Sequence, residues 1–69
     1  MNNYTANKLQ ALMGMLTSLG ISKTDTIGIC SLIPSEKAAN QIVKYLMSNQ
    51  KETPQTIVKN CTMIIKENL

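Results

Sequence analysis

Apolar residues recur along this chain at the three- and four-residue spacing of an α-helix, and no stretch alternates as a strand requires. The clearest stripe lies in the first twenty residues and consists of Leu9, Leu12, Met13, Leu16 and Leu19. Gly20 follows it at the position of a C-terminal cap. This pattern predicts a helix over about residues 5–19.

A second helix is predicted over about residues 23–33. Ser22 stands three residues before Asp25, which favours a helix start, and Pro34 marks the end. The apolar residues of this segment cover most of the helix circumference; they are Ile27, Ile29, Cys30, Leu32 and Ile33. Because a helix that is apolar on all sides is normally buried, we expect it to lie centrally, in contact with several neighbours.

Two further helices are predicted over about residues 36–48 and 54–68. Ser35 caps the first of them, and Thr53 followed by Pro54 is a strong start signal for the second. Their apolar stripes consist of Ala38, Ala39, Ile42, Val43 and Leu46, and of Ile57, Val58, Cys61, Ile64 and Ile65. The connections are short. The sequence therefore predicts an all-α protein, a compact single-domain bundle of four short helices spanning residues 1–69.

The composition leaves little material for an active site. The 69 residues include no His and only four carboxylates, which are well separated along the chain. Acid/base catalysis needs a His or paired carboxylates, and zinc prefers clustered Cys and His. Cys30 and Cys61 fall on apolar stripes and are expected to be buried free thiols. We expect no catalytic residue, no cofactor, no metal ion and no small-molecule substrate.

Nucleic-acid binding is an alternative, because the second and third helices are joined by a tight connection, as in a helix-turn-helix. The polar side of the third helix carries Lys37, Asn40, Gln41 and Lys44. Asn and Gln can pair with adenine, and Lys can contact phosphate or guanine. The net charge of +3 gives weak support, and the chain contains no Arg, the most frequent base reader. A solvated polar face explains these residues more simply.

Protein–protein interaction is the leading hypothesis, and five residues are candidates for the interface: Tyr4, Ala11, Met15, Gly28 and Met63. The first three widen the apolar face of the first helix, and Met63 is predicted on the solvent side of the fourth. Gly28 belongs to a strip of small residues, with Thr24 and Ser31, that would let another backbone approach. The partner would be another protein or a second copy of the chain.

The sequence suggests neither secretion nor membrane insertion. Its first residues lack the charged and apolar regions of a secretory signal, and no apolar run has the length of a membrane span. We therefore expect a cytoplasmic, non-enzymatic helical protein that acts by macromolecular binding.

Overall fold

The computed structural model describes the chain from Asn3 to Leu69, and its side chains from Asn7 onward. This part of the chain forms four helices, α1 (Asn3–Ser18), α2 (Lys23–Leu32), α3 (Glu36–Ser48) and α4 (Pro54–Glu67). The predicted all-α bundle is confirmed. The limits of α3 are those predicted, and the other helix limits agree within two residues; for example, Leu19 and Ile33 lie just beyond the ends of α1 and α2.

The helix ends follow the signals in the sequence. Ser22, Ser35 and Thr53 each accept a hydrogen bond from the backbone N–H three residues later. These bonds satisfy N–H groups that have no partner within the helix. At the end of α1, Gly20 has a φ of 91°. The N–H of Ile21 then donates to the carbonyl of Leu16 at 3.1 Å, as in a Schellman motif.

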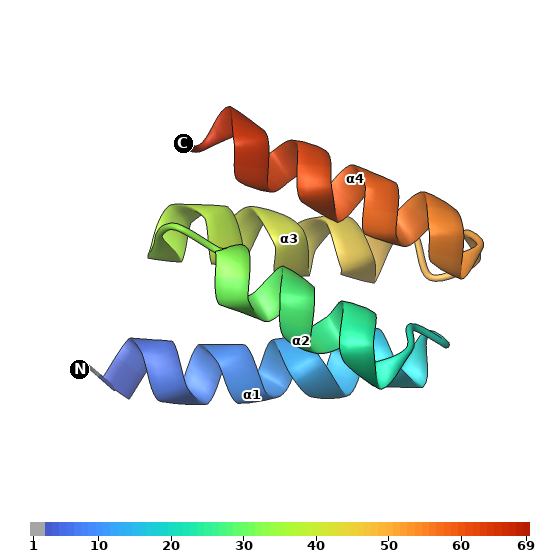
Figure 1. Ribbon diagram of the computed structural model, residues 1–69, viewed down its shortest axis with the longest axis horizontal. Helices are drawn as coiled ribbons and strands as arrows, with labels where there is room; N and C mark the ends of the chain where they lie inside the picture. The colour runs from blue at the N-terminus through green and yellow to red at the C-terminus, as the bar shows by residue number, and fades with distance from the viewer. Residues whose placement is uncertain (1–2) are drawn as a thin grey trace.

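The helices form two antiparallel hairpins, α1 with α2 and α3 with α4 (Figure 1). The helices also pack across the hairpins, α1 against α3 and α2 against α4. Within residues 3–69, no Cα atom of α2 comes within 8 Å of a Cα atom of α3, and the same holds for α1 and α4. Each helix therefore has two neighbours, in the cyclic order α1, α2, α4, α3. The extended residues 33–35 connect two helices that lie diagonally across the bundle.

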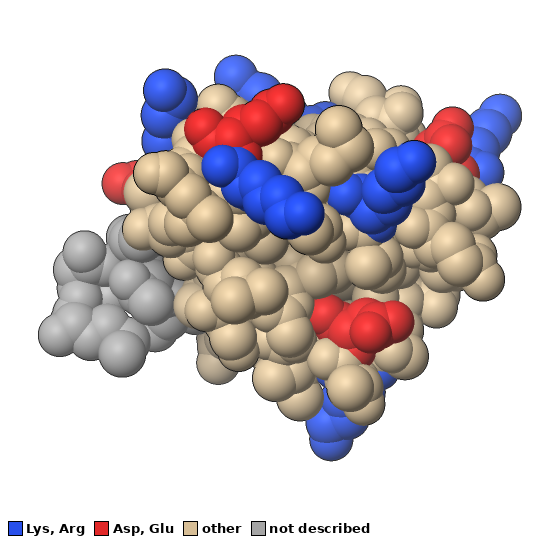
Figure 2. Space-filling model, turned by 45° about the horizontal axis from the view of Figure 1, so that its top comes forward, with Lys and Arg blue, Asp and Glu red and all other residues tan. Residues whose placement is uncertain are grey.

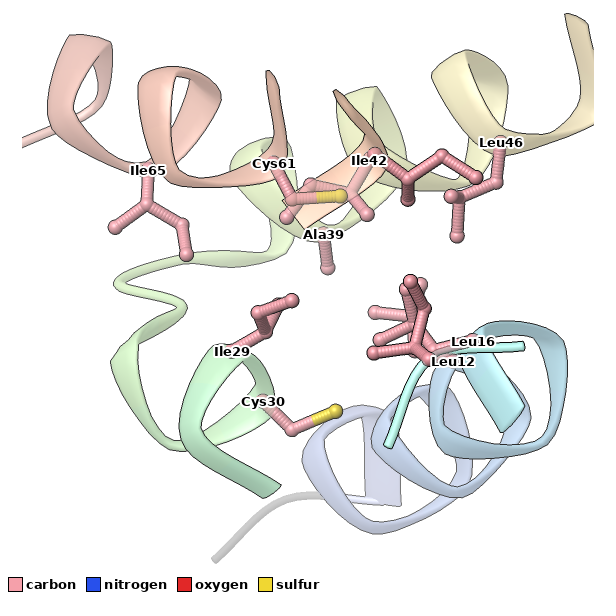
Figure 3. Close-up of a cluster of buried hydrophobic side chains, with 11 residues drawn as sticks. Leu12, Leu16, Ile29, Cys30, Ala39, Ile42, Leu46, Cys61 and Ile65 are labelled. Carbon is pink, nitrogen blue, oxygen red and sulfur yellow. The ribbon is translucent and has the colours of Figure 1, made fainter. Parts of the chain in front are cut away.

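All four helices contribute to one aliphatic core (Figure 3). The residues in it that are completely shielded from solvent are Leu12, Leu16, Ala39, Ile42, Leu46, Ile57 and Cys61. Tyr45 and Asn60 add a polar link between α3 and α4, because the Asn60 side-chain amide donates to the Tyr45 hydroxyl at 2.8 Å. Burial of the aliphatic side chains is the main stabilising contribution.

The predicted central position of α2 is wrong. This helix lies at the front in Figure 1 and packs only against α1 and α4. Its inner face buries Ile29 and Cys30 together with Thr26, whereas Ile27 is 45 % exposed and Leu32 is 64 % exposed. A helix with two packed neighbours can bury only one side, so the apolar residues on its opposite side remain in solvent.

Candidate functional site

The structure distributes the four candidate interface residues with described side chains over three helices, with Ala11 and Met15 about one turn apart on α1. Gly28 is exposed on α2, Ala11 is exposed on α1, and Met63 on α4 is 48 % exposed. Met15 is partly buried against the core and lines a hollow together with Leu46 of α3. The side chain of Tyr4 lies outside the described residues.

A different apolar surface is present on the solvent side of α2. We call it the outer face of α2 and define it by five exposed residues: Thr24, Ile27, Gly28, Ser31 and Leu32. The sequence pattern predicted Ile27 and Leu32 as buried residues, whereas both are exposed. The apolar pattern is consistent with this exposure, because a helix that is apolar on all sides keeps an outer apolar face whenever it packs at the surface.

Gly28 is open to solvent within the molecule. A Cβ built on Gly28 would meet no atom within 4 Å, and its φ does not require a glycine. No other helix of this chain therefore packs into the space that a side chain at Gly28 would fill. A glycine inside a helix costs about 0.5–1 kcal/mol relative to Ala. No contact within the described structure offsets that cost.

Met13 is a further exposed apolar residue, on α1. Met15 faces α3, and Met13 is two residues, or about 200°, away around α1, which places it on the flank beside α2. Met13 is 37 % exposed. Met63 lies on another part of the surface, because it is one helical turn from Asn60, which contacts α3.

The four candidate DNA contacts do lie together. Together with Glu36 they line a hollow of about 440 Å³ on α3. The four residues are Lys37, Asn40, Gln41 and Lys44. The side-chain oxygen of Gln41 accepts a hydrogen bond from the Asn68 amide at 2.9 Å, which ties Gln41 to α4. Glu36 adds a negative charge where phosphate would approach. The hollow therefore has mixed rather than uniformly positive charge.

The packing of α2 and α3 also does not favour a helix-turn-helix. In that motif the two helices pack against each other. Here they lie diagonally across the bundle, without Cα atoms within 8 Å of each other. The face shown in Figure 2 has lysines interspersed with carboxylates rather than a continuous basic stripe. DNA binding by α3 stays a prediction without support from the geometry.

The largest hollow described, about 470 Å³, lies between the α1–α2 turn and the start of α4. Its lining includes Ile21, Pro54 and Val58, and Asp25 is its only ionisable side chain. One carboxylate supplies neither an acid/base pair nor an activated nucleophile. Among the described residues, no three potential metal ligands come together.

The two cysteines are free and buried. Burial raises the pKa of both thiols, and burial together with the charge of Cys30 raises the pKa of Cys61 to about 11. Both therefore remain protonated near neutral pH, and a protonated thiol is a poor nucleophile.

The chain matches no protein-family model, no curated protein and no solved structure. Across residues 3–69, no helix combines the length and hydropathy of a membrane span. The outer face of α2 is the candidate site that carries two exposed large apolar side chains, Ile27 and Leu32.

Proposed function

We propose that this protein is a small, non-enzymatic helical protein that acts by binding another protein through the outer face of α2. The observation that carries the proposal is the exposure of Ile27 and Leu32 on a helix whose opposite side is already buried in the core. A partner covering this face would give α2 the all-round burial that its sequence favours. Exposed apolar patches of this kind are typical of interaction sites.

The proposal includes a cytoplasmic location. Two free cysteines in a chain of this size suit a reducing compartment, where disulfides rarely persist. The proposal also holds that the protein is not an enzyme. The protonated thiols support this, as does the single carboxylate in the hollow of about 470 Å³.

The test is a capture experiment with two matched variants of the immobilised protein. Leu32 and Met47 are 64 % and 63 % exposed, and they lie on α2 and α3, which are diagonal to each other. We expect wild type and Met47→Glu to retain the same protein from an extract of the cells that produce the chain. Leu32→Glu should lose it, because a carboxylate cannot be desolvated cheaply in an apolar contact. Equal retention by Leu32→Glu would exclude the outer face of α2 as the binding surface.

A further inference from the structure

We infer that the partner of the outer face of α2 is a second copy of this chain, packed about a two-fold axis with the two α2 helices antiparallel. This inference rests on the proposed function and specifies the partner. Three features support it: the symmetry of the face about Gly28, its charge, and the area that a stable contact requires.

The arrangement of large and small residues on the face is self-complementary. Thr24 lies four residues before Gly28 and Leu32 lies four residues after it, so all three fall on one side of the helix. A two-fold axis passing beside Gly28 brings Leu32 of each copy over Thr24 of the other. Each large side chain then meets a small one, and the open space at Gly28 lets the backbones approach.

The distribution of charge favours this face for a contact between copies. Each copy carries a net charge of +3, so two copies repel each other in general. None of the seven lysines lies between Thr24 and Leu32, and Asp25 is the only charged residue there. The outer face of α2 therefore contains no lysine, and Lys23 at the start of the helix is the only lysine of α2. Because salt screens the remaining repulsion, added salt should strengthen the association.

The area that a stable contact requires favours a partner as broad as the molecule itself. An ordinary interface buries about 800 Å² per partner, under a fifth of the 4565 Å² surface of this molecule. A single bound peptide helix would cover little more than α2, which has only ten residues. A second copy brings a whole side of a 32 × 22 × 21 Å molecule.

Sedimentation equilibrium of wild type, Leu32→Glu and Met47→Glu at low and high salt tests the inference. We expect wild type and Met47→Glu to approach twice the monomer mass at high micromolar concentration, more readily at high salt. Leu32→Glu should dissociate at least about tenfold more easily, as expected for a central apolar contact. Thermal melting checks that each variant is folded.

A cysteine placed beside the axis tests the geometry. A Cβ at Gly28 meets no other atom, so Gly28→Cys should fold, and air oxidation should convert it to a covalent dimer. Ser48→Cys, exposed at the end of α3, is the control and should cross-link much more slowly.

The outcomes separate the inference from the proposed function. Wild type that remains monomeric at every concentration overturns the second copy as partner, while capture that depends on Leu32 would still support binding of a different protein. A dimer that forms equally well in Leu32→Glu overturns the location of the contact. A dimer that is sensitive to Leu32→Glu but does not cross-link faster through Gly28→Cys than through Ser48→Cys overturns the antiparallel arrangement.

Discussion

At the scale of single residues, Thr26 is the least expected member of the core. It is 1 % exposed, and its hydroxyl has no hydrogen-bond partner. A buried polar group without a partner costs about 1–3 kcal/mol. Thr26→Val keeps the branched shape and removes the hydroxyl, so we expect the free energy of unfolding in urea to rise by about 1 kcal/mol. Thr17→Val, at an exposed site on α1, should change it by less than about 0.5 kcal/mol. A loss of stability in Thr26→Val would mean that the hydroxyl has a partner.

Cys61 makes a prediction about pH. Burial, together with the charge of Cys30, raises its pKa to about 11 in the folded protein, above the 9.0 of an unburied thiol. Between these values the folded state binds more protons than the unfolded state, so stability falls as the pH rises. We expect chemical denaturation of wild type to show a larger loss of stability from pH 9.0 to about 11 than that of Cys61→Ala. All other side chains are common to both proteins, so parallel curves would argue against a buried thiol.

At the scale of single helices, the start of α4 depends on one side chain. The Thr53 hydroxyl accepts a hydrogen bond from the N–H of Thr56 at 3.3 Å and donates one to the Thr56 hydroxyl at 2.9 Å. Thr53→Ala removes both, and we expect it to lower the unfolding free energy by about 1 kcal/mol. Thr53→Ser keeps the hydroxyl and should stay within a few tenths of wild type. Equal losses in both variants would assign the effect to packing of the Thr53 methyl group.

The helices could be predicted because their boundary signals are local. The hydrogen bond from the Asp25 N–H to Ser22 spans three residues, and the backbone of Gly20 adopts its conformation within one turn. The position of α2 in the bundle could not be predicted in this way. It depends on which helices pack together, and the all-round apolar pattern of α2 is equally consistent with a central helix or with a surface helix awaiting a partner.

At the scale of the whole molecule, the candidate site was predicted only in part. Gly28 was identified because a glycine inside a helix is costly and calls for an explanation. Ile27, Leu32 and Met13 were assigned to the core, because a periodic pattern shows which residues share a face but not whether that face is covered. Met15 was identified as part of a broad apolar face, and the structure covers it with α3. Surfaces become distinguishable from core only when all the helices are placed.

The hairpin arrangement also has a kinetic consequence. Each hairpin unites helices that are adjacent along the chain, and residues 33–35 hold the two hairpins close together. Closing such short loops takes well under a microsecond, and helical proteins dominated by local contacts fold in microseconds to milliseconds. The monomer should therefore form long before two copies meet in dilute solution, so that in the proposed dimer each α2 would present an already shaped surface to the other.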